Sequence, residues 1–218
     1  MICVMGGNKA SAKSVSLQNI ATYFSNNEQK IAVLDTDVQQ SFKRWSERRA
    51  LNRIISNFDT YTGYGKIGQQ LIELAEQYDA VFVDVKGTNS EEFIIASALA
   101  DIVLVPLQST IKSLETLDEL NVQYNEVKKI NKKIIFCLFQ VLGTTNIFTA
   151  GNKRNFFVNE CGKYNNFKLL NSIICQRDSF EHSDREGKTV FETSDQKAQA
   201  EIQQLASEIV LIANSIDY

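Results

Sequence analysis

Residues 1–14, MICVMGGNKASAKS, decide the fold of this chain. The first five are apolar and run into Gly6-Gly7, which predicts a short buried strand that ends in a turn. Apolar side chains then recur at helical spacing, at Leu17, Ile20, Ala21 and Phe24. The chain therefore opens with a strand, a loop of small residues and a helix.

Apolar strands and amphipathic helices alternate along the rest of the sequence. Further strands are predicted at 31–34, 80–83, 102–105, 134–139 and 169–174, with the fourth strand ending at Pro106. Helices are predicted at 67–77, 114–130 and 202–216. Strands that are apolar throughout are typical of a parallel sheet with both faces covered. The predicted fold class is α/β, a doubly wound, mostly parallel sheet with helices on both faces.

Length and composition indicate one soluble globular domain over residues 1–218. Hydrophobic residues make up 44% and charged residues 22% of the chain, which excludes general disorder. The 23 basic and 26 acidic residues give a net charge of −3, which argues against a globally basic, nucleic-acid-coating protein. The chain has a single proline, Pro106, and no low-complexity linker.

The cysteines and the apolar stretches indicate a cytoplasmic location. Cys3, Cys137, Cys161 and Cys175 show no CxxC spacing, so we expect reduced structural thiols rather than a metal site. No apolar stretch approaches the roughly 20 residues of a membrane span, and the first residues are too short and uncharged for a signal peptide.

The first loop has the spacing of a phosphate-binding P-loop. Such a loop reads GxxxxGK[ST] between a strand and a helix, and Gly7, Lys13 and Ser14 occupy its fixed positions. Its backbone amides and lysine would bind phosphate oxygens, and the serine hydroxyl would help to hold Mg²⁺. Ala12 stands where the motif has its second glycine. The alternative is a turn of small residues with a solvated lysine.

Acidic residues follow the next two predicted strands. Asp35 and Asp37 come after the second strand, and Asp84 comes after the third. Carboxylates at such strand ends can hold Mg²⁺ or orient an attacking water. The alternative is that each Asp caps a turn or a helix. Three such residues beside a P-loop-like turn favour the first interpretation.

Four further segments, in order and spacing, resemble the ParA/MinD-type deviant Walker ATPases, especially small ParA/ParF-like partition proteins. IAVLDTDVQQSFKRWSERR (31–49) looks like the strand and DxDPQ segment, and YDAVFVDVKG (78–87) like the Walker B strand. ALADIVLVPLQST (98–110) looks like the segment that passes the nucleotide base. ICQRDSFEHSDREGKTVFETSD (174–195) looks like the late arginine and glycine segment.

The resemblance implies an ATP and Mg²⁺ site. Lys13 would be the Walker A lysine, Asp37 would position the hydrolytic water, and Mg²⁺ would lie near Ser14, Asp35 and Asp84. Gln108 would lie near the base, and Arg177 matches the late arginine. The implied nucleotide-binding set is Gly7, Asn8, Ala10, Ser11, Ala12, Lys13, Ser14, Val15, Gln108 and Arg177.

The loop departs from the pattern KGGxGK[ST] of that family. A second, signature lysine there reaches the phosphates of a dimer partner. The position that corresponds to this signature lysine is Asn8, and Lys9 is the next residue. Lys9 therefore takes this catalytic role only if the loop is one residue shorter than in the family. Val38 replaces the proline after DxD. Two functions follow: an active partition-type ATPase, or a degenerate member that senses nucleotide or binds partners without hydrolysis.

The resemblance also implies partners. An ATP-bound homodimer would bind DNA non-specifically, and a ParB-like or other partner protein would stimulate slow hydrolysis; no membrane is implied. The candidate basic clusters are Lys43-Arg44 with Arg48-Arg49, Lys128-Lys129 with Lys132-Lys133, and Lys153-Arg154. Each can equally be a solvated surface. A dinucleotide-binding protein ranks last, because no GxGxxG follows the first strand.

Overall fold

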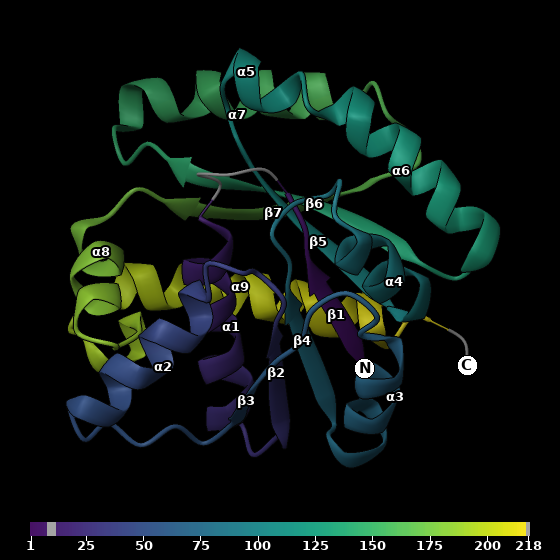
Figure 1. Cartoon of the computed structure of the whole chain (residues 1–218). Helices are drawn as coiled ribbons and strands as arrows, with labels where there is room; N and C mark the ends of the chain where they lie inside the picture. Colours follow the sequence, from purple (N-terminus) through teal and green to yellow (C-terminus); the bar gives the residue numbers. More distant parts are fainter. Residues whose placement is uncertain (8–11, 217–218) are drawn as a thin grey trace.

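A parallel sheet forms the centre of the molecule. The computed structural model describes residues 1–7 and 12–216. Within them, seven strands pair in parallel in the order β3-β2-β4-β1-β5-β6-β7 (Figure 1). Their bounds are β1 Ile2–Met5, β2 Ile31–Asp35, β3 Asp59–Thr62, β4 Ala80–Asp84, β5 Ile102–Gln108, β6 Ile135–Gly143 and β7 Lys168–Cys175. All carboxyl ends therefore meet at one edge, as they must in a parallel sheet.

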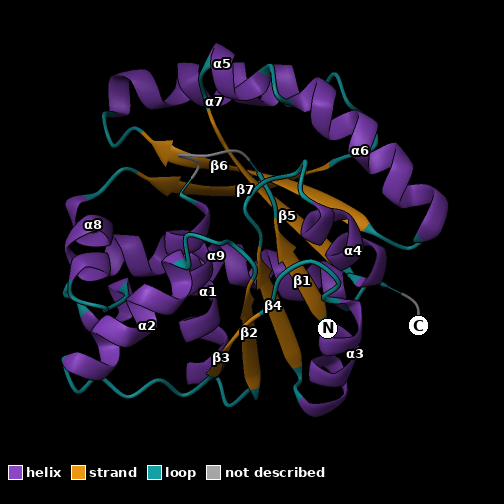
Figure 2. Cartoon of the chain, in the orientation of Figure 1, coloured by secondary structure: helices purple, strands orange, loops and turns teal. Residues whose placement is uncertain are grey.

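Helices cover both faces of this sheet (Figure 2). On one face lie α1 Lys13–Asn26, α2 Ser41–Leu51, α8 Asp178–Arg185 and α9 Gln196–Ala213, with the 3₁₀ helix η1 Val190–Glu192. On the other lie α3 Gly68–Gln77, α4 Glu91–Leu99, α5 Ile111–Leu114, α6 Leu117–Ile130 and α7 Ile147–Cys161. The predicted fold class is confirmed, and every described strand pair is parallel.

The strands divide their side chains between two cores. In β1, Cys3 and Met5 pack under α1 and α9, whereas Ile2 and Val4 pack under the opposite layer. Successive side chains of a strand point to opposite faces, so an apolar strand supplies both cores at once. This explains why β1, β2 and β4 are apolar without alternation. Trp45 of α2 is fully buried in the first core.

Strand β5 runs past the proline at which the sequence predicted its end. It continues through Pro106 to Gln108. Its pairing with β1 stops at Leu104, whereas its pairing with β6 continues to Gln108. Pro106 therefore lies where β5 no longer pairs with β1, so its lack of a backbone N–H removes no hydrogen bond on that side of the strand.

The thiols are free, as the spacing predicted. Cys3, Cys137 and Cys161 are buried and Cys175 is half-buried. Burial, the largest cause in each case, raises the pKa of the Cys137 and Cys161 thiols to about 12. They are therefore protonated at neutral pH and pack as small apolar side chains. Among the helices of residues 1–7 and 12–216, none combines the length and apolarity needed to cross a bilayer.

Candidate nucleotide site

Two described residues, Gly7 and Ala12, lie at the two ends of the turn between β1 and α1, and both have a positive φ. Gly7 has φ 118°, a conformation that a residue with a side chain rarely adopts. Ala12 has φ 53° and ψ 27° and directly precedes α1. Its left-handed conformation is the one that glycine would adopt freely, so Ala12 keeps the shape of the missing glycine at a cost of about 1–2 kcal/mol. The predicted residues Asn8, Lys9, Ala10 and Ser11 lie outside the described residues.

Lys13 and Ser14 form the first turn of α1 and face the ends of β1 and β4. Lys13 Nζ donates to Gly7 O at 2.9 Å. Ser14 Oγ donates to Asp84 Oδ2 at 2.7 Å. Burial lowers the pKa of Lys13, an effect that the negative charges of Asp84 and Asp37 oppose. The helix N-terminus and this lysine place positive potential where a phosphate would bind.

Asp84 is a buried carboxyl at the end of β4. Burial, its largest cause, raises the pKa of Asp84 to about 7, with a further rise from the charge of Asp35, while the Ser14 hydrogen bond opposes it. A carboxyl in this state gains strongly from a nearby cation. It is therefore suited to a metal ion or a lysine that arrives with a ligand.

Asp35 and Asp37 extend the acidic group along β2. Asp35 is Asp84's neighbour in the sheet, since the two residues are paired between β2 and β4. Its oxygens accept from the backbone N–H groups of Asp37 at 3.0 Å and Lys43 at 3.1 Å. Burial nevertheless raises the pKa of Asp35. Asp37 is half-buried and Oδ1 accepts from Gln39 N–H at 2.9 Å.

A cavity of about 560 Å³, which we name the Lys13 cavity, is lined by Lys13, Ser14 and Asp37 but not by Asp35 or Asp84. Its described lining includes four basic side chains (Lys13, Arg44, Arg48 and Lys86) and two acidic ones (Asp37 and Asp184). Ala12, Ser14, Val15, Gln18, Gln39 and Ser41 complete the lining. The excess of positive charge suits a polyanion such as a nucleotide phosphate chain.

A second cavity of about 250 Å³, the Arg177 cavity, lies on the other side of the same turn. It is lined from the ends of β6 and β7 by Leu142, Ile174, Cys175, Gln176 and Arg177, from α8 by Asp178, Phe180, Glu181 and Asp184, and from the first turn of α1 by Ala12, Val15 and Ser16. The two cavities share Ala12, Val15 and Asp184. Its lining combines apolar side chains such as Leu142, Ile174 and Phe180 with polar ones, as in many pockets for organic ligands.

Gln108 and Arg177, two predicted nucleotide-binding residues, differ in their relation to the two cavities. Gln108 ends β5, where its backbone N–H donates to Ser113 Oγ at 3.0 Å, and it lines neither cavity. Arg177 does line the second cavity, but Glu201 holds its guanidinium through two hydrogen bonds, at 3.0 and 2.6 Å. The α8 residues that line these cavities were missed, because within the segment 174–195 only Arg177 was assigned a role.

The donors around Asp84 fit a magnesium ion that arrives with a phosphate ligand. In P-loop enzymes the P-loop serine and a Walker B carboxylate hold Mg²⁺. Ser14 and Asp84 are already in contact, which is the required juxtaposition. In the described part of the chain no three His, Cys, Asp or Glu side chains form a cage for a metal. Mg²⁺ commonly keeps waters and takes its remaining ligands from substrate phosphates.

In the predicted basic cluster of Lys43-Arg44 and Arg48-Arg49, two arginines form ion pairs within the fold. Arg49 is buried, and Nη1 and Nη2 donate to Glu192 Oε2 at 2.9 Å and Oε1 at 2.7 Å. Arg48 pairs with Asp184 at 3.3 Å. Assigning Arg49 to a DNA-binding cluster is therefore wrong, because its charge is neutralised inside the fold. Arg154 likewise bonds Leu170 O at 2.7 Å.

The chain is similar in fold to several solved structures. It superimposes on apo McdA from Cyanothece with a TM-score of 0.78 and 11% identity, over 96% of this chain and 98% of that chain. It superimposes on MinD from Aquifex aeolicus with a TM-score of 0.75 and 14% identity, over 96% of this chain and 95% of that chain. With a plasmid partition protein from Borrelia burgdorferi the TM-score is 0.68 and the identity 16%, over 96% of this chain and 97% of that chain. No family model matches the sequence, and no curated protein matches it.

These likenesses cover nearly the whole chain, and they agree with the order of its motifs. At such low identity, what they establish is the architecture. The resemblance predicted from the sequence is confirmed at that level: the chain has the fold of McdA, MinD and a plasmid partition protein, which is the fold of the ParA/MinD-type Walker ATPases.

Proposed function

We propose that this protein is an ATP-dependent partition or positioning protein of ParA type. ATP would bind between the β1–α1 turn and the ends of β4 and β2 and drive homodimerisation. The observation behind the proposal is the hydrogen bond between Asp84 and Ser14, a serine that lines a cavity together with four basic side chains. That combination of hydroxyl, carboxylate and positive charge is the chemistry needed for a magnesium–triphosphate.

Each residue of the site then has a role. Lys13 neutralises charge on the phosphate chain, since its ammonium group already lies beside the turn. Ser14 and Asp84 would hold Mg²⁺, with Asp35 beside them in the sheet. When bound, the ion would neutralise charge on the phosphates. Asp37 lies at the cavity wall, where its carboxylate would orient a water toward the terminal phosphate.

The two cavities together suit a whole nucleotide. The phosphates would lie in the Lys13 cavity and the base in the Arg177 cavity, on either side of the shared residues Ala12 and Val15. Structures of this fold have been solved with ATP, for a McdA variant, and with ADP and magnesium, for a cobyrinic acid a,c-diamide synthase. These complexes support ATP and Mg²⁺ as the ligands of this site.

Partners follow from the same proposal. The dimer would bind DNA non-specifically through lysines that remain exposed, such as Lys132. A ParB-like or other partner protein would stimulate slow hydrolysis; MinD of Aquifex aeolicus, which has this fold, has been solved in complex with MinC. We propose a cytoplasmic protein that acts as one domain over residues 1–218.

Hydrolysis measurements test the proposal directly. Phosphate release from Mg-ATP is measured for the wild type, Lys13→Ala and Asp37→Ala, with Lys66→Ala as a control because Lys66 is exposed and lines neither cavity. The first two substitutions should abolish turnover and the control should retain it. Unchanged turnover in both Lys13→Ala and Asp37→Ala would sink the proposal.

A second candidate function is a nucleotide sensor or binding module that does not hydrolyse ATP. The observation in its favour is Ala12, which holds a strained left-handed backbone at the position where the P-loop pattern has glycine. Such a loop can keep its shape and still fail to move during turnover. Binding of Mg-ATP without any phosphate release, in the wild type, would establish this second function.

A further inference from the structure

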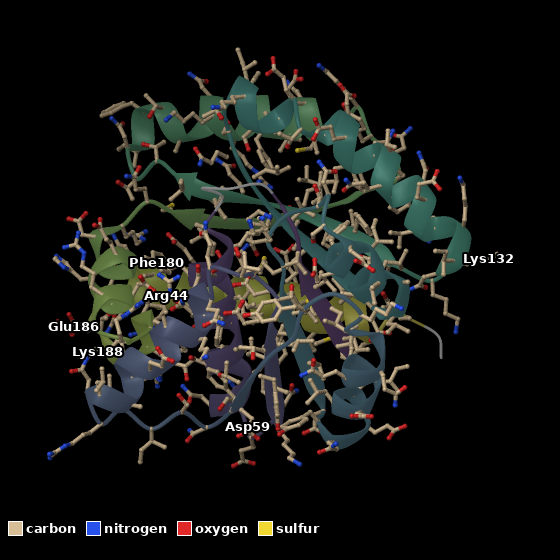
Figure 3. All side chains as sticks on the ribbon, viewed as in Figure 1. Arg44, Asp59, Lys132, Phe180, Glu186 and Lys188 are labelled. Atoms are coloured by element: carbon tan, nitrogen blue, oxygen red, sulfur yellow. The ribbon has the colours of Figure 1, made fainter. Side chains whose placement is uncertain are left out.

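The Lys13 cavity contains more positive charge than the roles above use. Arg44 extends from α2 and Lys86 follows β4, and both line the cavity. Figure 3 shows Arg44 on the flank where α2 meets α8. The remaining basic residue of α2 in this lining, Arg48, is paired with Asp184 at 3.3 Å. Neither Arg44 nor Lys86 forms an ion pair with an acidic side chain among the described residues.

The sheet register places Lys86 next to the turn that contains Asp37. Asp35 in β2 and Asp84 in β4 are direct neighbours in the sheet. Asp37 follows Asp35 by two residues, and Lys86 follows Asp84 by two residues. The segments after β2 and β4 therefore leave the carboxyl edge of the sheet from neighbouring strands. Asp37 and Lys86 line the same cavity. No hydrogen bond or ion pair joins Lys86 to any other residue in the described part of the chain.

Arg44 reaches the same turn from α2. Its Nη2 donates to Gln39 O. Gln39 N–H in turn donates to the Asp37 carboxylate at 2.9 Å. One nitrogen of the guanidinium is thus fixed to the Asp37 turn, while its remaining N–H groups are available in the cavity. The turn is therefore flanked by two cations, one from α2 and one from the segment after β4.

We infer that Lys86 and Arg44 bind the terminal phosphate of the nucleotide, an inference that rests on the proposed function. Lys13 lies at the start of α1, beside the loop, and serves the phosphates nearer to it. The Asp37 turn is where an attacking water would be held, so the group that reaches it is the last phosphate. A lysine supplies a point charge and an arginine a planar fork to its oxygens.

The consequence is discrimination between ATP and ADP within a single chain. A diphosphate would occupy the part of the cavity near Lys13 and leave Lys86 and Arg44 in water. A triphosphate would recruit both cations and, through Gln39, pull the Asp37 turn against the phosphate. Lys86 and Arg44 are thus phosphate-binding residues that favour a triphosphate over a diphosphate.

Paired binding measurements test this inference. Affinities for Mg-ATP and Mg-ADP are measured at one fixed salt concentration for the wild type, Lys86→Met, Arg44→Met and Lys66→Met. Lys86 and Arg44 are exposed, so methionine should not disturb folding. Loss of one charge-assisted contact should weaken ATP binding about tenfold in each of the first two variants and change ADP binding less than about twofold. The Lys66→Met control should bind both nucleotides as the wild type does.

The outcomes separate this inference from the proposed function. Equal weakening for ATP and ADP, or no weakening for ATP, in a protein that binds Mg-ATP through Lys13 overturns the inference alone. A wild type that binds neither nucleotide, or one whose ATP affinity is unchanged in Lys13→Met, overturns the proposed function and the inference with it. Selective loss for ATP in Lys86→Met and Arg44→Met supports both.

Discussion

The Ser14 hydroxyl and the Asp84 carboxylate are joined by a hydrogen bond of 2.7 Å that connects the start of α1 to the end of β4. The two residues are 70 positions apart in the sequence, and they meet because β1 and β4 are adjacent in the sheet. The contact brings the serine of the P-loop-like turn to a buried carboxyl. The described site is thus held in one arrangement before any nucleotide arrives.

The raised pKa of Asp84 predicts a pH-dependent stability of the nucleotide-free protein. Between pH about 4 and 7 the folded state keeps a proton on Asp84 that the unfolded state has released, so stability falls as pH rises. Asp84→Asn removes this effect and should raise the free energy of unfolding at pH 8 by up to about 4 kcal/mol. Urea unfolding of both proteins between pH 4 and 8 measures it; a difference that does not vary with pH would contradict it.

The left-handed Ala12 predicts that glycine is tolerated better at this position. Ala12→Gly relieves the contact of Cβ with the backbone, but it also adds freedom to the unfolded chain, so we expect a net gain of about 0.5–1 kcal/mol. Thermal or urea unfolding measures the gain. The matched control is Ala50→Gly, in the exposed part of α2, which should lose up to about 1 kcal/mol. A loss in Ala12→Gly comparable to the control would contradict the strained conformation.

The ion pair between Arg49 and Glu192 predicts a large stability effect far from the nucleotide. Arg49 is buried, and it also donates to Gly187 O at 2.9 Å and Ile55 O at 3.1 Å. Arg49→Met leaves these acceptors without a partner and should lower the free energy of unfolding by about 3 kcal/mol. Lys129→Met, which breaks the exposed pair with Glu126, should change it by less than about 0.5 kcal/mol.

The same pair should weaken in acid. Burial raises the pKa of Glu192, but the Arg49 hydrogen bonds outweigh it and the net pKa is lowered. Its stabilisation is therefore present above the pKa of an unfolded glutamate and is lost as the pH falls through the lower, folded value. Stability measured from pH 6 down to pH 3 should converge for the wild type and Glu192→Gln. Curves that stay parallel would show that Glu192 does not titrate with folding.

DNA binding, if it follows the proposal, should depend on the Lys128–Lys133 region rather than on Arg49. Lys132 is exposed and lies on the opposite side of the molecule from Arg44 (Figure 3). With Mg-ATP present, Lys132→Met should reduce the slope of log affinity against log salt by about 1, since one phosphate contact is lost. The measurement is fluorescence anisotropy with a random duplex at several salt concentrations. A slope equal to that of Lys66→Met would remove Lys132 from the contact surface.

The strands of the sheet were predictable because their composition is extreme. β1, β2 and β4 are continuous apolar runs that end in glycine or aspartate, and no other element has that pattern. β3, Asp59–Thr62, was missed because it is a polar edge strand with exposed side chains. α7 was also missed, since Ile147 and Phe148 point to solvent and break the helical period.

The site was predictable where its residues lie directly after a strand. Ser14, Asp35, Asp37 and Asp84 meet at one edge because the parallel sheet brings all strand ends together. Arg44 and the α8 residues were not predicted as site residues, because their position depends on how α2 and α8 pack over α1. Lys86 was missed although it follows β4 by two positions, because the pattern there pointed only to Asp84. That packing is decided by contacts such as Trp45 Nε1 to Lys188 O at 3.1 Å, which no local pattern encodes.

The most direct test of the central claim is equilibrium binding of ATP with and without Mg²⁺, for the wild type and Lys13→Met. We expect micromolar binding that requires Mg²⁺ and is lost in Lys13→Met, because in the proposed function Lys13, Ser14 and Asp84 together form the phosphate and metal site. No binding by the wild type up to millimolar ATP, or binding unaffected by Lys13→Met, would contradict it.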